Sequence, residues 1–297
     1  MESSIFNRCR AYILERFPLH TVGVGVLLCY WLSYHLFGHM AGIQTWSLLT
    51  ITSLSSFLLF FFQLRLVDDL DDIRHEDIPH ERARSRRVWL SIAVASNSAV
   101  ILLLNLRNDA FWLVVSILCL MLFTPFVLNR LLRSPDAVEP LTTGRPLTDA
   151  VTALFYEGLI LLIVLYVYIT WRQITGVTLG WLNTLSVVVV PWGVYEVWKF
   201  SRYLSRPDWR PYALSWNRVR AFLLVLLLLM LTTQIYIGQV LEAASGYFIY
   251  VTAVYLISSL YLVVSNPIDG EERDSKSRKY AGIYYMLAVT LGVAFLV

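Results

Sequence analysis

Long runs of apolar residues alternate with short polar segments along most of the chain. A run of roughly 20 apolar residues is long enough to cross the hydrocarbon layer of a bilayer as an α-helix. Lipid cannot satisfy free backbone N–H and C=O groups, so continuous runs of this length are helical. We therefore predict an all-α polytopic membrane protein with nine transmembrane helices, near residues 19–40, 45–67, 88–106, 110–129, 150–171, 176–199, 217–238, 245–265 and 279–297.

The composition agrees with this pattern. Hydrophobic residues make up 57% of the chain and charged residues 15%, and the mean hydropathy is +0.61. A soluble core cannot enclose so large an apolar share in 297 residues. No polar stretch is long enough for a soluble domain, so residues 1–297 are expected to form a single membrane domain. The net charge of +3 without a basic cluster excludes a nucleic-acid surface.

The basic residues predict the orientation in the membrane. If nine spans alternate, 22 of the 24 Lys and Arg residues lie on the side of the N-terminus. Only Arg107 and Arg172 lie on the other side. Cytoplasmic loops carry the excess of Lys and Arg, so the N-terminus is predicted to be cytoplasmic and the C-terminus outside. A bacterial inner membrane is the expected location.

An acidic segment follows the second apolar run. Seven of the 21 acidic residues lie within residues 65–87. Asp68, Asp72 and Glu76 are four residues apart, which places them on one face of a helix that continues past the apolar run. Asp69 lies beside this face. Because like charges at this spacing repel, we expect counter-cations, either arginines or Mg²⁺ bound together with a substrate phosphate. A solvated, salt-bridged loop is the alternative interpretation.

The end of the sixth run carries a second charged group. Glu196 lies at the expected membrane edge, and Tyr195 and Lys199 are four residues apart on one helix face. Arg202 and Asp208 follow in the next polar segment. Aromatic and cationic anchoring at the interface is one interpretation. The other is a diphosphate that magnesium bridges to carboxylates while Lys and Arg bind it, which requires both helix ends.

Four polar residues inside the predicted spans are candidates for lining a cavity. Glu157 is either a protonated structural group or a base that removes a proton from an acceptor or a carbocation. Asn97, Asn183 and Gln234 either form hydrogen bonds between helices or line a cavity, and the first role is the more common one.

At the two charged helix ends, the chain resembles the UbiA-type intramembrane prenyltransferase superfamily. The family's first motif, N-D-x-x-D-x-x-x-D, is matched with Asp in place of Asn and Glu in place of the last Asp by Asp68, Asp69, Asp72 and Glu76. Tyr195 and Lys199 match the family's Y-x-x-x-K. The second acidic motif, D-x-x-x-D, is not intact, and Glu196 and Asp208 are its acidic candidates.

This resemblance implies a magnesium-dependent enzyme that transfers or cyclises the isoprenyl group of a polyisoprenyl diphosphate. It also implies nine helices around a central cavity for the lipid tail, and an acceptor that the sequence does not identify. The implied magnesium ligands are Asp68, Asp69, Asp72, Glu76, Glu196 and Asp208. The implied diphosphate-binding residues are Arg65, Lys199 and Arg202, with Tyr195 orienting the diphosphate. A transporter and a non-catalytic, lipid-binding family member are the alternative functions.

Overall fold

The computed structural model describes residues 12–14, 17, 22–73, 80–132, 146–204, 216–264 and 284–293. Within these ranges, the side chains of residues 71–72, 80–84, 124–132, 146–157, 200–204, 216–222 and 259–264 lie outside the description. The described residues form helices and contain no strand. The helices are α2 (Val24–Ala41), α3 (Leu48–Asp72), α4 (His80–Asn105), α5 (Phe111–Leu132), α6 (Pro146–Thr175), α7 (Trp181–Leu204), α8 (Trp216–Val240), α9 (Ser245–Val264) and a C-terminal helix, Tyr284–Val293.

Each predicted apolar run overlaps one of these helices, and most of the helices extend beyond their runs. The helix α3 continues to Asp72, as the acidic segment predicted. The helix α4 begins at His80, eight residues before the predicted start. Its first turns are rich in Arg and Glu, which favour helix without adding apolar character. An apolar run therefore marks the membrane part of a helix and misses its polar extension.

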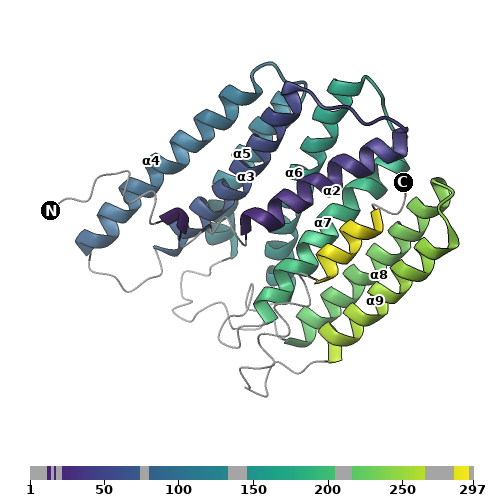
Figure 1. Ribbon diagram of the computed structural model, residues 1–297. Helices are drawn as coiled ribbons and strands as arrows, with labels where there is room; N and C mark the ends of the chain where they lie inside the picture. Colours follow the sequence, from purple (N-terminus) through teal and green to yellow (C-terminus); the bar gives the residue numbers. More distant parts are fainter. Residues whose placement is uncertain are drawn as a thin grey trace.

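The helices form one elongated bundle (Figure 1). The helix α2 packs against α7, α6 and α3, and α6 also packs against α5. At one end of the bundle α4 packs on α3, and at the other end α8 lies between α7 and α9. The largest fully buried side chains come from the middle helices and include Phe37, Phe57, Phe60, Tyr166 and Trp171. Bulky aromatic side chains thus fill the described interior between the middle helices.

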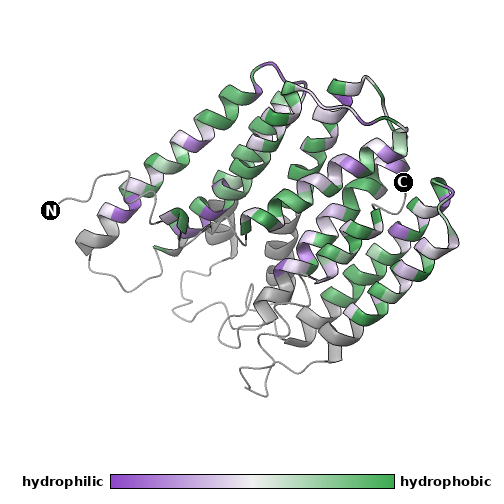
Figure 2. Cartoon of the chain, in the orientation of Figure 1, coloured by the Kyte–Doolittle hydropathy of each residue, from purple (hydrophilic) through white to green (hydrophobic). Residues whose placement is uncertain are grey.

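Apolar surface shows that the bundle is embedded in a membrane. Within the described ranges, four helices are long and apolar enough to cross a bilayer: Leu48–Leu70, Ser85–Asn105, Gly158–Thr175 and Leu223–Val240. Hydrophobic residues make up most of the described length of the helices (Figure 2), and many of them are exposed. Leu103, Val225 and Ile249, for example, are 66%, 65% and 72% exposed. Water would disfavour so extensive an exposed apolar surface, whereas lipid tails solvate it.

Exposed tryptophans mark one end of the bundle. Trp46 lies between α2 and α3, Trp112 starts α5 and Trp181 starts α7, and all three side chains are exposed. Tryptophan concentrates at membrane–water interfaces, where its amphipathic ring sits at the level of the lipid head groups. Because α3 and α7 both start at this end, their charged C-terminal turns lie together at the opposite end of the bundle.

Amide side chains join neighbouring helices through hydrogen bonds. Asn97 of α4 donates to the Gln63 side chain of α3 at 2.7 Å. Tyr236 of α8 donates to the side chain of Asn183 of α7 at 2.8 Å. Both asparagines therefore have the helix-joining role that the sequence favoured, since polar side chains in membrane helices form hydrogen bonds across to neighbouring helices.

The helices α7 and α8 approach closely at Gly193. A Cβ atom at this position would lie 2.0 Å from the sulfur of the buried Met230. We expect Gly193→Ala to lower the free energy of unfolding by about 1–3 kcal/mol through overpacking, as measured by thermal or denaturant unfolding in detergent. Adding Met230→Ala should remove part of this cost, so the two single effects should not sum.

A second glycine serves as the control for this prediction. In the described part of the chain, nothing lies within 4 Å of a Cβ built on Gly158 of α6. The variant Gly158→Ala should therefore be neutral or stabilise the helix by up to about 1 kcal/mol. Equal losses in the Gly193 and Gly158 variants, or strict additivity with Met230→Ala, would contradict the close contact between α7 and α8.

Candidate functional site

The C-terminal turn of α3 carries an arginine held by two carboxylates. Arg65 contacts Asp68 through Nη1 and Asp69 through Nη2, both at 2.8 Å. These contacts have i,i+3 and i,i+4 spacing, which places the side chains on neighbouring positions of the helix surface. The Asp69 side chain is 0% exposed, whereas that of Asp68 is 46% exposed. Of these two adjacent carboxylates Asp69 is therefore the buried one, although the four-residue spacing placed Asp68, and not Asp69, on the predicted acidic face.

Tyr12 of the N-terminal segment joins the cluster of Arg65, Asp68 and Asp69. Its hydroxyl donates a hydrogen bond to Asp69 Oδ2 at 2.6 Å. Its ring contacts Trp89 of α4 and Phe62 of α3, with centroid distances of 5.2 and 6.1 Å. These aromatic contacts exclude water from Asp69, so its charge must be balanced by hydrogen bonds and by Arg65. Sequence analysis missed Tyr12, because no pattern in the polar N-terminal segment links it to residue 69.

The contact between Tyr12 and Asp69 leads to a local prediction. In Tyr12→Phe the ring contacts remain and the hydrogen bond to the carboxylate is lost. A hydrogen bond to a charged group contributes about 1.5–3 kcal/mol. We expect faster hydrogen exchange at residues 12–14 and little change in the global unfolding midpoint. Tyr34→Phe is the control. It removes a phenol of α2 that contacts Thr50 at the opposite end of α3, and it should leave the exchange at residues 12–14 unchanged. Unaltered exchange in Tyr12→Phe would show that the hydrogen bond does not hold the segment.

The C-terminal part of α7 carries a second buried ion pair. Lys199 Nζ lies 2.7 Å from Glu196 Oε2, and the Glu196 side chain is 0% exposed. Cys29 of α2 donates to the carbonyl oxygen of Pro191 and interacts electrostatically with Glu196. Two charges in an apolar environment are tolerated when they are close together. Glu196 and Lys199 are the charged residues of this helix end whose side chains are described, and they lie inside the bundle and are not exposed interfacial anchors.

Aromatic residues connect the two charged helix ends. The ring of Tyr195 of α7 packs at a tilt against Phe61 of α3 with a centroid distance of 4.9 Å, and it also contacts Trp198. Gly25 of α2 lets the Trp198 ring pack closely, since a Cβ there would lie 3.0 Å from the ring. Phe61 lies two helical turns before Asp69, and Tyr195 lies one turn before Lys199. The structure thus brings both charged groups to the same end of the bundle, around a shared aromatic contact.

Three of the six predicted magnesium ligands, Asp68, Asp69 and Glu196, have described side chains. Asp68 and Asp69 offer the carboxylate oxygens that magnesium prefers, and Arg65 contacts both. No group of three or more His, Cys, Asp or Glu residues that could hold a metal ion occurs in the described part of the chain. The predicted site residues Glu76 and Asp208 lie outside the described residues, as do the side chains of Asp72, Glu157 and Arg202.

Comparison with protein-family models, with curated proteins and with solved structures found no match for this chain. The case for a function therefore rests on the chain's own residues and on the sequence resemblance.

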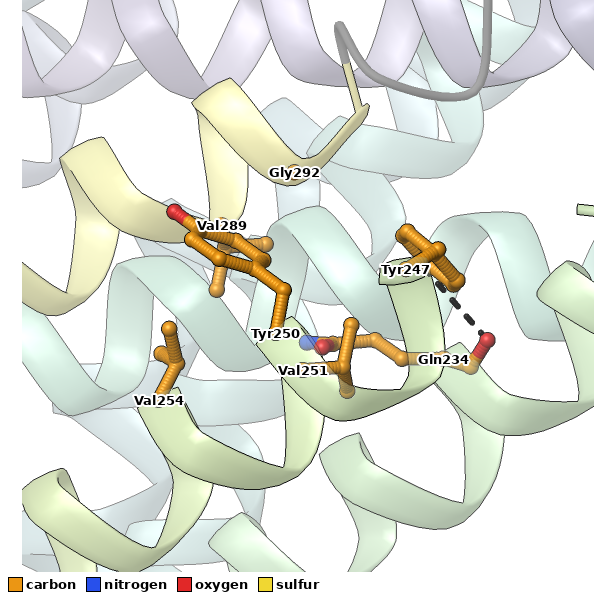
Figure 3. A pocket seen from close by; sticks show the side chains of 7 residues that line it. All are labelled: Gln234, Tyr247, Tyr250, Val251, Val254, Val289 and Gly292. Atoms are coloured by element: carbon orange, nitrogen blue, oxygen red, sulfur yellow. Dashed lines mark hydrogen bonds between the residues drawn. The ribbon is translucent and has the colours of Figure 1, made fainter. Parts of the chain in front are cut away.

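A cavity lies away from these charged helix ends (Figure 3). It is formed by α8, α9 and the C-terminal helix and is lined by Gln234, Tyr247, Tyr250, Val251, Val254, Val289 and Gly292. Its volume is about 10 Å³, the space that one water molecule needs. This cavity is therefore too small to be the predicted central cavity for an isoprenyl tail.

Proposed function

We propose that this protein is a membrane-embedded enzyme that transfers or cyclises the isoprenyl group of a polyisoprenyl diphosphate at the C-terminal ends of α3 and α7. One observation carries the proposal. Two fully buried carboxylates, Asp69 and Glu196, lie at the same end of an otherwise apolar bundle, each beside a cation. Ionisable groups at membrane depth are costly to bury and are functional by default. The resemblance of these segments to the UbiA-type superfamily supplies the reaction class.

The two ion pairs contain the groups that a lipid diphosphate requires. Arg65 and Lys199 provide cations for the phosphate oxygens, and Arg binds such oxygens through two parallel N–H groups. In the free protein these cations neutralise Asp68, Asp69 and Glu196. A bound diphosphate would draw the cations away from the carboxylates. Departure of the diphosphate from the isoprenyl carbon leaves negative charge on its oxygens, which the two cations stabilise in a site with little water.

Magnesium is the proposed cofactor, with Asp68, Asp69, Asp72 and Glu76 as ligands and with Glu196 and Asp208 as further candidates. The bound ion would supply Lewis-acid stabilisation of the leaving diphosphate. Tyr195 would orient the diphosphate, because its ring is fixed against Phe61 one turn before Lys199. Arg202 is proposed as a further diphosphate-binding cation and Glu157 as the base.

The finer topology also belongs to this proposal. All nine helices would cross the membrane, with the N-terminus and the charged helix ends in the cytoplasm and the C-terminus outside. The membrane would be a bacterial inner membrane. The isoprenyl tail would lie in a cavity among the middle helices. Because Phe57, Phe60 and Tyr166 fill the described interior, this cavity requires aromatic side chains to change rotamer when the substrate enters.

Equilibrium binding tests the proposal. We expect the purified protein in detergent to bind labelled geranyl, farnesyl or geranylgeranyl diphosphate in the presence of Mg²⁺, and to bind it weakly in EDTA. Asp68→Asn should weaken binding by about tenfold or more, equivalent to at least about 1.4 kcal/mol. Asp109→Asn is the control, since this exposed acid lies between α4 and α5 at the opposite end.

Three results separate the alternatives. Binding of all three diphosphates that is independent of Mg²⁺ and of Asp68 contradicts the proposed site. Tight, Mg²⁺-dependent binding without release of diphosphate favours a non-catalytic, lipid-binding member. Gradient-driven uptake of substrate into proteoliposomes favours a transporter.

A further inference from the structure

Gln234 of α8 is a buried amide with an unused donor. Gln234 is 5% exposed, and its Nε2 atom has no hydrogen-bond partner in the part of the chain that the structure describes. Its amide group lies between Tyr250 and Val251 and lines the cavity between α8, α9 and the C-terminal helix (Figure 3). Buried donors almost always have an acceptor, so this exception requires an explanation.

The polar neighbours of the cavity are directed elsewhere. The Tyr247 hydroxyl donates to the backbone carbonyl of Gln234 at 3.5 Å, and the Tyr250 hydroxyl donates to the carbonyl of Ala288. The Tyr285 phenol of the C-terminal helix is close enough to the Gln234 side chain to interact with it, but neither this phenol nor any other described acceptor meets hydrogen-bond geometry at Nε2. A ligand in this cavity therefore needs to present one acceptor atom to the amide.

The rest of the cavity is apolar and small. Val251, Val254 and Val289 form its walls, and Gly292 leaves room for the Tyr250 ring, which a Cβ would approach to 2.9 Å. The volume of about 10 Å³ admits one oxygen atom or one water molecule. The bulk of any larger ligand must therefore remain outside the cavity.

The surface around the cavity is the lipid-facing surface of the bundle. Tyr250 and Val254 are partly exposed at its rim. On the same helices, Ile249 and Ile257 of α9 and Leu291 of the C-terminal helix are 72%, 69% and 57% exposed. A molecule that reaches Gln234 past these residues comes from the bilayer. An apolar molecule with a single acceptor oxygen matches both the surroundings and the unused donor.

We propose that this cavity binds a bilayer lipid through one ester carbonyl oxygen, which accepts a hydrogen bond from Gln234 Nε2, while the acyl chain lies along α9 and the C-terminal helix. The proposal is independent of the reaction at α3 and α7, because no residue of the cavity belongs to those helices.

Thermal unfolding with two matched lipids tests this proposal. Delipidated full-length protein in detergent is supplemented with dioleoyl phosphatidylcholine or with its ether-linked analogue, which lacks the carbonyl oxygens. We expect the ester lipid to raise the unfolding midpoint by about 2–4 °C more than the ether lipid. In Gln234→Leu this difference should vanish. Thr233→Val should retain it, because the Thr233 hydroxyl donates to Leu229 within α8.

Every outcome of this comparison is decisive. Equal stabilisation of the wild type by ester and ether lipids overturns the proposal and indicates an ordered water only. A difference that persists in Gln234→Leu also overturns it, since the amide is then not the donor. Should Gln234→Leu fail to fold, Gln234→Met removes the same donor from an unbranched side chain, and the wild-type comparison stands without either variant. Loss of the difference in Tyr285→Phe but not in Gln234→Leu would assign the oxygen to Tyr285 and overturn the proposal.

Discussion

Replacing Lys199 by methionine should lower the free energy of unfolding by about 3–5 kcal/mol. The reason is the fully buried Glu196 carboxylate, which lies 2.7 Å from the Lys199 ammonium group. Methionine preserves most of the side-chain volume, so the main change is the loss of the positive charge. The carboxylate then stays charged in an apolar environment or must take up a proton. Unfolding in mixed micelles, followed by circular dichroism, measures the loss.

A double variant separates charge from packing at this position. In Glu196→Gln combined with Lys199→Met both charges are absent, and most of the lost stability should return, because pairs of buried charges are often no better than neutral residues of similar size. Arg107→Gln removes an exposed cation at the other end of the bundle and should change stability by less than about 0.5 kcal/mol. If Lys199→Met and the double variant are equally unstable, the loss of stability does not come from leaving the buried Glu196 carboxylate without its cation.

The second large effect is expected at Asp69. Asp69→Ala should lower the free energy of unfolding by about 2–3 kcal/mol, whereas Asp68→Ala should lower it by less than about 1 kcal/mol. Both carboxylates contact Arg65 at 2.8 Å. Asp69, however, is buried and accepts a hydrogen bond from Tyr12, while Asp68 is half exposed and its ion pair is screened by solvent.

The same pair of variants shows whether burial or position in the motif determines the effect. The two residues are adjacent, carry the same group and share the same arginine, so each is the control for the other. Equal losses in the two alanine variants would contradict the difference in burial. Added salt should reduce the effect of Asp68→Ala more than that of Asp69→Ala, because exposed charges are screened more strongly.

The fold was predictable as far as apolar runs determine it. Nine runs correctly located nine helical segments among the described residues, since a bilayer leaves a long apolar segment no other backbone structure. The start of α4 at His80 was not predictable from hydropathy, because the Arg-rich turn before residue 88 carries no apolar signal. That all nine helices cross the membrane stays a prediction.

The candidate site was predictable only in part. Four-residue spacing correctly placed Asp68 and Asp72 on one helix and Lys199 beside Tyr195 and Glu196. The burial of Asp69 rather than Asp68 depends on Tyr12, Trp89 and Phe62, which come from three separate parts of the chain.

The amide positions illustrate the same limit. Asn97 and Asn183 form hydrogen bonds between helices, which is the common role of amides in membrane helices, whereas the cavity beside Gln234 arises from three helices packing together. Packing between segments that are distant in the sequence therefore determines which buried amide is left with an unused donor, and a local sequence pattern cannot predict this.

Release of diphosphate from radiolabelled isoprenyl diphosphates, measured in a single turnover with purified protein, tests most directly whether the ends of α3 and α7 act on a phosphorylated lipid. We predict release that requires Mg²⁺, that is lost in a folded Asp68→Ala protein and that is unchanged in Asp109→Asn. Absence of release from the geranyl, farnesyl and geranylgeranyl compounds, or release that ignores both Mg²⁺ and Asp68, would contradict the proposed enzyme.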